Sequence, residues 1–383
     1  MGKMLIRNIG TLVSGDVSDP ILDADSILVS DGIIEAVGSD LSAEGVDIII
    51  DAQGTTVTPG LIDSHCHVVI GDFTPRQRML DFLDSELHGG VTQVISAGEV
   101  HLPGRPKDAA GVKALAILAA KAFDNFRPGG IKVRGGALIL EPGLTEEDFA
   151  EMAREGVKTV GEIGLGKVKK PEDAAPMVAW AKKYGMTVMM HTGGTSIPGS
   201  SVVTADQVIA TNPDVVSHLN GGPTSVSPEE ARKIVMETDL VYEISHCGNP
   251  KMILEVCRLT REKNAYHRVV IGNDHPSGTG VVPLGILRVL NMIASIGEIP
   301  PEIAVCMASG NTARVHKLDS GFIEPGKAAD LVIMDAPMGS VGDDALAALA
   351  AGDIPGVSKV IVDGEIKVQK SRNTPPPKRA ATL

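Results

Sequence analysis

The chain has 383 residues, 43% of them hydrophobic, which is enough to bury one large core and a smaller one. Its 35 basic and 48 acidic residues give a net charge of −13, which disfavours a nucleic-acid partner because phosphate contacts need a basic surface. The four cysteines form no CxxC pair, so neither a disulfide framework nor a zinc knuckle is expected. No apolar run approaches about 20 residues, and the first residues lack the apolar segment of a signal peptide. We therefore expect a cytoplasmic protein with no membrane partner.

Residues 1–59 are predicted to form short strands, because apolar runs such as SILVS alternate with Gly- and Asp-rich turns. The same pattern returns over residues 320–370. We expect these two segments to pair into one small β-sandwich domain. Residues 371–383 are polar and Pro-rich, which predicts an extended or disordered tail.

Residues 60–319 alternate apolar strands with longer helical segments such as PEDAAPMVAWAKKYG, which favours βαβ units and a parallel sheet in an α/β fold. The strand segments are TPGLIDSHCH, VTQVISAG, IKVRGGALIL, VKTVGEIGLG, TVMMHTGG, DVVSHLNGG, LVYEISHCG and RVVIGNDHP. Their number and the length of the region match a (β/α)8 TIM-type barrel. A doubly wound open sheet is the alternative, but no GxGxxG follows a first strand.

Metal-ligand residue types stand at the ends of these strands, where the active sites of such barrels lie. His65 and His67 are two residues apart after an apolar strand, so both imidazoles can face the barrel interior. His191 and His218 each end a strand and precede a glycine-rich loop. Imidazole is a common ligand of zinc and iron. We expect Thr192 and Asn220, which follow these two histidines, to contact the substrate.

Two carboxylates complete the expected site. Glu162 lies in the fourth strand, where it is expected to bridge two divalent ions. Lys158 is four residues earlier, some 13 Å below the strand end, and Lys167 is out in the following loop, so Glu162 is the better bridge. Asp274 ends the eighth strand, where it is expected to bind one metal and to act as general base and acid.

Other residues near the strand ends are expected to serve the substrate. His246 ends the seventh strand and is expected to face the substrate or to pack structurally, whereas His275 alternates away from Asp274. Arg105 lies in the loop after the second strand, together with His101 and Lys107. A cation there would pair with a carboxylate of the substrate.

Longer motifs now point to a family. TVTPGLIDSHCHV resembles the strand-one signature of the amidohydrolase superfamily, and GFIEPGKAADLVIMD resembles its return to a small β domain. The strands that end in His191, His218 and Asp274 resemble its later ligand strands, so the resemblance covers nearly the whole chain. Within that superfamily, PGRPKDAAG, MHTGGTSIPGSS, PDVVSHLNGGPT and KSRNTPPPKRAA are similar to segments of the enzymes that open cyclic enamides.

The resemblance implies a two-metal hydrolase that holds zinc with iron, or two zinc ions. The implied ligands are His65, His67, Glu162, His191, His218 and Asp274, with Glu162 in place of the modified lysine of many relatives. The implied substrate is a small cyclic amide that carries a carboxylate. Metal-activated hydroxide would convert 6-oxo-1,4,5,6-tetrahydronicotinate to 2-formylglutarate and ammonia. A homo-oligomer, a dimer or a tetramer, is expected.

Other functions stay open at this point. A dihydroorotase- or hydantoinase-like hydrolase would use the same ligands on another cyclic amide. A deaminase needs one metal and a Glu after the strand-five His, and Thr192-Gly193-Gly194 disfavours it. A catalytically silent interaction protein is disfavoured because all six ligand types are retained.

Overall fold

The computed structural model describes residues 2–70, 78–195, 201–222, 226–276, 282 and 284–383. Parts of the quoted segments MHTGGTSIPGSS and PDVVSHLNGGPT lie outside these residues. Among the helices of the described part, none is both long enough and apolar enough to cross a membrane.

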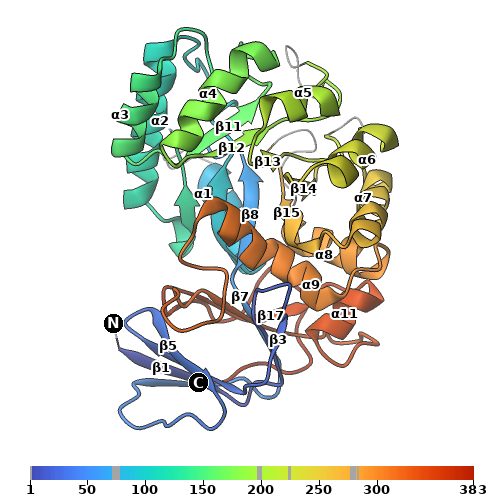
Figure 1. Ribbon diagram of the computed structural model, residues 1–383. Coiled ribbons are helices and arrows are strands. Elements are labelled where there is room, and N and C mark those ends of the chain that lie inside the picture. The colour runs from blue at the N-terminus through green and yellow to red at the C-terminus, as the bar shows by residue number, and fades with distance from the viewer. Residues whose placement is uncertain (1, 71–77, 196–200, 223–225, 277–281, 283) are drawn as a thin grey trace.

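The central region contains all eight of the expected strand segments, and the strands run parallel, as predicted for an α/β fold. One sheet has the order β10-β9-β8 and the other has the order β11-β12-β13-β14-β15. The strands are β8 (Leu61–Cys66), β9 (Val91–Ser96), β10 (Lys132–Arg134), β11 (Thr159–Ile163), β12 (Thr187–Met190), β13 (Val215–Val216), β14 (Val241–Ser245) and β15 (Val269–Gly272). Their side chains are almost entirely buried, because helices cover the outside of the sheets (Figure 1).

Backbone hydrogen bonds join the two sheets at both of their edges. After β10, Leu138 N donates to Thr159 O at 3.0 Å, and Gly161 N donates to Leu138 O at 2.8 Å. On the other side, Asp274 N donates to His65 O at 2.8 Å. The second junction therefore places the end of β15 directly beside His65, near the end of β8.

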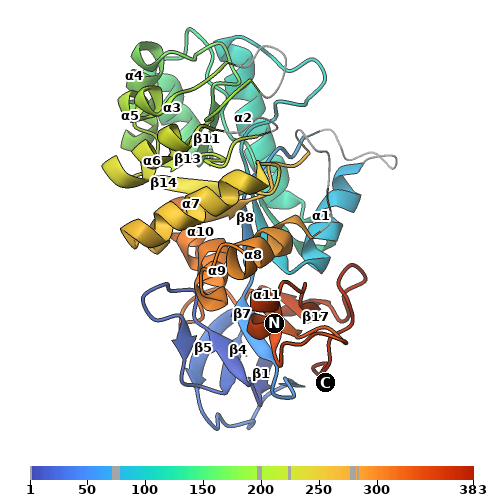
Figure 2. The same ribbon diagram turned by 90° about the vertical axis from the view of Figure 1, so that its right-hand side faces the viewer.

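The helices surround these strands (Figures 1 and 2). They are α1 (Arg78–His88), α2 (Ala109–Asn125), α3 (Glu146–Arg154), α4 (Pro171–Lys183), α5 (Ala205–Thr211), α6 (Pro228–Glu237), α7 (Pro250–Lys263) and α8 (Gly285–Ser295). Local sequence sets their starts: Asp108 caps α2, and Asn249 caps α7 just before Pro250 at its first position. Beyond α8, the chain passes through α9 (Pro301–Cys306), a π-helix over Met307–Asn311 and α10 (Thr312–His316).

Strands from the two ends of the chain lie in the same sheet, where β7 pairs with β16. One sheet has the order β5-β4-β1-β6 and the other has the order β18-β17-β16-β7-β2-β3. The strands are β1 (Lys3–Arg7), β2 (Thr11–Val13), β3 (Ile21–Leu22), β4 (Ser26–Ser30), β5 (Ile33–Gly38), β6 (Ile48–Asp51), β7 (Thr56–Pro59), β16 (Leu331–Asp335), β17 (Gly356–Val362) and β18 (Glu365–Val368), and α11 (Ala345–Ala351) lies between β16 and β17. Ile6 and Ile27 of the first sheet share one buried cluster with Leu331 and Ile361 of the second.

The segment 371–383 runs along these two sheets. Arg379 binds the carboxylate of Asp335 through Nη2 at 2.7 Å and Nε at 2.9 Å. Ala381 N donates to Ser358 Oγ at 2.9 Å, and Thr382 N donates to Asp51 O at 2.9 Å. The segment is therefore tied to both sheets by hydrogen bonds and one paired charge.

Candidate metal centre

The structure brings all six predicted metal-ligand residues together at the carboxyl ends of the strands. They form two adjacent buried groups, each with its ligand atoms within 4.8 Å of one another: His65, His67 and Asp274 in one, and Glu162, His191 and His218 in the other. The six come from five strand ends, so parallel strands in register are what makes them meet.

Glu162 joins the two groups, because its two carboxylate oxygens face different sides. Oε2 lies 3.6 Å from His65 Nε2 and 3.7 Å from His67 Nε2. Oε1 lies 3.3 Å from His191 Nδ1 and 2.5 Å from His218 Nε2. This is the arrangement that a carboxylate bridging two cations requires.

Lys158 and Lys167 lie away from this position. The side chain of Lys167 is 58% exposed, and its Nζ donates to Lys107 O at 2.7 Å. Lys158 is exposed and lines a separate cavity at the other end of β11.

Asp274 completes the first group. Its Oδ1 lies 3.1 Å from His67 Nε2 and 3.5 Å from His65 Nε2. The backbone at Asp274 has φ 57°, and the backbone at His218 has φ 33°, which is the left-handed region that residues other than Gly rarely adopt. Such conformations cost about 1–3 kcal/mol each and gather at functional sites. The fold therefore holds two of the six ligand residues in unfavourable backbone geometry.

In three of the histidines, the ring nitrogen on the other side of the imidazole also lies close to a hydrogen-bond acceptor. His67 Nδ1 lies 2.9 Å from Gly98 O, and His191 Nε2 lies 3.2 Å from Gly194 O. His65 Nδ1 lies 3.1 Å from the carboxylate of Glu243. Each partner is an acceptor, so it selects the tautomer whose other nitrogen is free to bind a metal.

The charges of the six residues depend on one another. Burial raises the pKa of Glu162, but the charges of His218 and His65 and hydrogen bonds from His191 and His218 outweigh burial, so the pKa lies well below its usual value. Burial lowers the pKa of His65, but the carboxylates of Glu243, Glu162 and Asp274 outweigh burial and raise it well above its usual value. His65 thus supplies positive charge that a bound cation would replace, with release of a proton. The buried nitrogen and carboxylate donors fit zinc or iron.

Thr192 and Asn220 lie beside the centre, but their polar groups bond to backbone. Thr192 Oγ1 donates to Ser217 O at 2.7 Å. The amide of Asn220 donates to Ser245 O at 2.9 Å and accepts from Ser245 N at 2.9 Å. These bonds fasten the ends of β12 and β13 to their neighbouring strands. Substrate contact by these two residues stays a prediction.

Arg105 lies in a loop over the same end of the strands. In that loop the ring of His101 stands 5.5 Å, centroid to centroid, from the ring of His67. Arg105 Nη1 lies 3.5 Å from Glu141 Oε1, and within the described ranges Arg105 forms no ion pair with the six ligand residues. A pairing of Arg105 with substrate stays a prediction.

A third group of donor side chains adjoins the six. His246, Cys247 and His275 offer ligand atoms within 4.8 Å of one another. Burial, with the nearby charges of His275 and Arg288, lowers the pKa of His246 to about 4. His246 is therefore neutral at pH 7. Its N donates to Gly272 O at the end of β15 at 2.9 Å. Substrate contact by His246 stays a prediction.

Sequence reasoning missed the carboxylates that support this centre. Glu243 is fully buried on β14, and Asp63 accepts from His65 N at 3.0 Å and from Asn273 N at 2.9 Å. Burial and the charge of Glu86 raise the pKa of Asp63 to about 7. The sequence does show one acidic residue in each of these strands, Glu243 in VYEIS and Asp63 in LIDSHC, and an acidic residue inside a buried strand could have indicated a supporting role.

Comparison with known proteins agrees with this geometry. The model of the amidohydrolase family matches residues 56–367. The chain belongs to the amidohydrolase family. It is an enzyme that hydrolyses C–N bonds. This amidohydrolase is 61% identical to an enamidase of Eubacterium barkeri, and the match covers 100% of both chains.

Solved structures give the same result for the fold. The crystal structure of enamidase superimposes with a TM-score of 0.96 and 62% identity and covers 99% of each chain. A putative prolidase from Bifidobacterium longum covers 99% of this chain and 96% of its own, with a TM-score of 0.66 and 19% identity. At that identity only the architecture is shared, so the prolidase likeness supports the amidohydrolase fold and says nothing of substrate.

Proposed function

We propose that the chain hydrolyses the cyclic enamide 6-oxo-1,4,5,6-tetrahydronicotinate to 2-formylglutarate and ammonia. The observation that carries the proposal is the buried six-residue centre with Glu162 between its halves. The full-length similarity to enamidase supports the choice of substrate. Deamination by a one-metal site is disfavoured, because the six predicted ligand residues form two adjacent groups rather than one.

His65, His67 and Asp274 would hold one divalent ion, and His191 and His218 would hold a second, with Glu162 shared. We propose zinc with iron, or two zinc ions, because imidazole and carboxylate donors suit both metals. Ions bound at such a site lower the pKa of water toward neutrality and polarise a carbonyl oxygen.

Asp274 is proposed to carry the proton of the reaction. Its carboxylate lies at the centre of the first group and is buried, so it can accept a proton from the attacking water and return it to the ring nitrogen. Cleavage of the lactam C–N bond by one water leaves a carboxylate and an enamine. The enamine tautomerises to an imine, and a second water converts the imine to the aldehyde and ammonia.

The carboxylate of the substrate needs a cation near the strand ends. We propose Arg105, whose loop already touches the centre through His101. Glu141 holds the Arg105 guanidinium at 3.5 Å, and Lys167 lies 3.7 Å from the other oxygen of Glu141. These two neighbours would keep Arg105 in place before the substrate arrives. Thr192, Asn220 and His246 are proposed to shape the same pocket.

We also propose a closed barrel and a β-sandwich for the fold around this site. The hydrogen bonds at both sheet edges support closure of the eight strands into a barrel over residues 60–319. The shared apolar cluster supports a β-sandwich built from residues 1–59 and 320–370, with 371–383 as an extended tail. Assembly into a dimer or tetramer and a cytoplasmic location stay predictions.

Metal analysis combined with an ammonia-release assay tests the function. We expect about two ions per chain and ammonia release from 6-oxo-1,4,5,6-tetrahydronicotinate. Ring opening of dihydroorotate and of a hydantoin, which yields a carbamoyl acid and no ammonia, is followed by chromatography and should be much slower. A chain that binds two ions but prefers another cyclic amide would contradict the proposed substrate. A folded chain that binds no metal would overturn the enzyme and favour an interaction protein.

A further inference from the structure

Glu243 is a fully buried carboxylate in the middle of β14. Its strand, VYEIS, contains no other charged residue. Within the described ranges its ion-pair partner is His65, and no Lys or Arg contacts it. A buried carboxylate is costly unless positive charge or hydrogen bonds compensate it. The position therefore needs an explanation beyond packing.

The contacts of Glu243 reach both halves of the centre. Oε1 lies 3.1 Å from His65 Nδ1 and accepts from the backbone N of His218 at 3.3 Å. Oε2 accepts from Ser64 Oγ at 2.9 Å. One carboxylate thus ties β14 to a ligand of the first group and to the backbone of a ligand of the second.

The space for this carboxylate is kept open by Gly272 on β15. A Cβ at that position would lie 2.7 Å from His65 Cβ and 2.8 Å from Glu243 Cδ, distances that real Cβ atoms do not show. Only a residue without a side chain lets His65 and Glu243 meet across the end of β15. The contact between His65 and Glu243 therefore depends on residues of β8, β14 and β15.

His65 differs from the other ligand histidines in the partner of its second nitrogen. His67 and His191 face neutral carbonyl oxygens there, and His218 Nδ1 has no hydrogen-bond partner among the described residues. A carboxylate partner raises the basicity of an imidazole and fixes its tautomer more strongly than a carbonyl does. Glu243 also adds a carboxylate beside Glu162 and Asp274, which would face two dications.

We propose that Glu243 is a positioning residue of the metal centre. It orients His65 with Nε2 toward the ion, offsets residual positive charge, and couples that ion to the loop that carries His218. The proposal rests on the proposed two-metal function. Removal of this outer carboxylate is expected to weaken binding of the ion at His65 and His67 by about 10- to 100-fold.

The test compares Glu243→Ala and Glu243→Gln with Tyr242→Phe. Tyr242 is buried on the opposite face of β14, where its hydroxyl bonds Thr260 Oγ1 at 2.8 Å, so Tyr242→Phe is a matched perturbation of the same strand. Each purified holoenzyme is titrated with a chelator, and ions per chain and turnover are followed.

We expect Glu243→Ala to lose one ion about 10- to 100-fold more readily, and added zinc to restore kcat with KM unchanged. Glu243→Gln keeps an acceptor for His65 and should fall between Glu243→Ala and the parent. Tyr242→Phe should release its ions like the parent. If Glu243→Ala does not fold, Glu243→Gln decides alone.

Parent-like retention of both ions in Glu243→Gln and, where it folds, Glu243→Ala would overturn the proposal, and so would activity that metal cannot restore. A parent enzyme without two ions would instead overturn the proposed function, so the two failures are distinguishable.

Discussion

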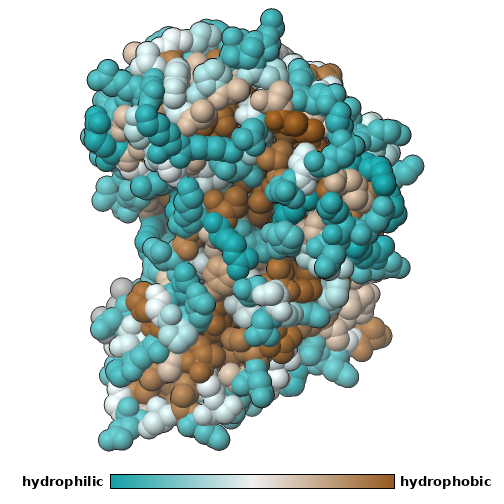
Figure 3. Space-filling view, in the orientation of Figure 1, coloured by the Kyte–Doolittle hydropathy of each residue, from teal (hydrophilic) through white to brown (hydrophobic). Residues whose placement is uncertain are grey.

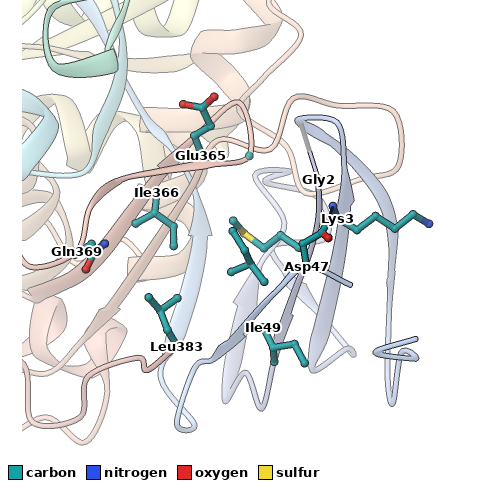
Figure 4. Close-up of a pocket in the computed structure, with 11 residues that line it drawn as sticks. Gly2, Lys3, Asp47, Ile49, Glu365, Ile366, Gln369 and Leu383 are labelled. Carbon is teal, nitrogen blue, oxygen red and sulfur yellow. Dashed lines mark hydrogen bonds between the residues drawn. The ribbon is translucent and has the colours of Figure 1, made fainter. Parts of the chain in front are cut away.

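The metal centre at the carboxyl ends of the parallel strands and the groove in the terminal β region differ in the chemistry that they gather. The groove has a volume of about 790 Å³ and lies between the edge strands β6 and β18 (Figure 4). Its lining residues are Gly2, Lys3, Met4, Asp47, Ile48, Ile49, Gly364, Glu365, Ile366, Gln369 and Leu383. Ile49, Ile366 and Leu383 bring apolar side chains to it, and hydrophobic surface extends over this end of the molecule (Figure 3).

The difference concerns how polar groups are used. In the groove, the Asp47 carboxylate accepts from Lys3 N at 2.8 Å, and no group of metal-ligand side chains gathers among the described residues that line it. At the metal centre, six donor side chains are buried in two adjacent groups, and the ligand atoms of each group lie close together. The volume of the groove is therefore a weak indicator of function. Buried donor side chains that converge are a strong one, because their burial would otherwise be costly.

Replacement of Glu162 with Gln should impair the metal centre more than any other substitution. A neutral amide has one oxygen and cannot serve both groups, so we expect fewer ions per chain and the largest loss of ammonia release of any variant. Elemental analysis and the activity assay check this. Glu141→Gln, another buried carboxylate near the strand ends, is the control and should keep its ions. Full metal content in Glu162→Gln would contradict the bridge.

Replacement of Asp274 with Asn should separate metal binding from proton transfer. The amide cannot take up the proton, so kcat should fall by about 10²–10⁴-fold while the metal content stays intact. Steady-state kinetics with metal analysis on the same preparation measures both. Near-normal turnover would remove Asp274 from the proton-transfer role.

Replacement of Arg105 with Met should affect binding more than turnover. A hydrogen bond to a charged group contributes about 1.5–3 kcal/mol, so KM should rise roughly 10- to 100-fold with kcat little changed. Arg127→Met is the control, since Arg127 pairs with Asp363 outside the site. An unchanged KM in Arg105→Met would assign recognition of the carboxylate to another cation.

Replacement of Ile48 with Thr should have the smallest effect. Ile48 is 41% exposed at the groove, and a surface change that keeps strand propensity should alter the free energy of unfolding by no more than about 0.5 kcal/mol. Thermal denaturation and kcat/KM of the variant measure this. A clear loss of activity would show that the groove, like the metal centre, takes part in function.

Much of the site was visible in the sequence, because each ligand is a polar residue that ends an apolar strand. His65 and His67 show the alternation directly, and Asp274 closes RVVIGND. That they meet depends on strand order, which the alternation of strands and helices predicts only at the level of fold class. The choice of Glu162 over Lys158 followed from residue spacing along one strand, and the structure places the Glu162 carboxylate between both groups.

Partners far apart in the chain could not be predicted. Glu243 contacts His65, which is 178 residues earlier, and no local pattern links them. The sequence showed Asn220 next to a ligand, but not that both ends of its amide bond to Ser245. The polar, Pro-rich composition of 371–383 likewise gave no sign that Arg379 would find Asp335.

The antiparallel pairing of β7 with β16, in which Pro59 stands opposite Leu331, has a consequence for how the protein is made. Translation proceeds at about 5–20 residues per second, so β7 leaves the ribosome roughly tens of seconds before its partner exists. During that interval the edge of β7 that later pairs with β16 presents unpaired backbone groups, and such edges promote aggregation. The first strands to be synthesised are thus among the last to be completed, and we expect the yield of active enzyme in cells to depend on chaperone capacity.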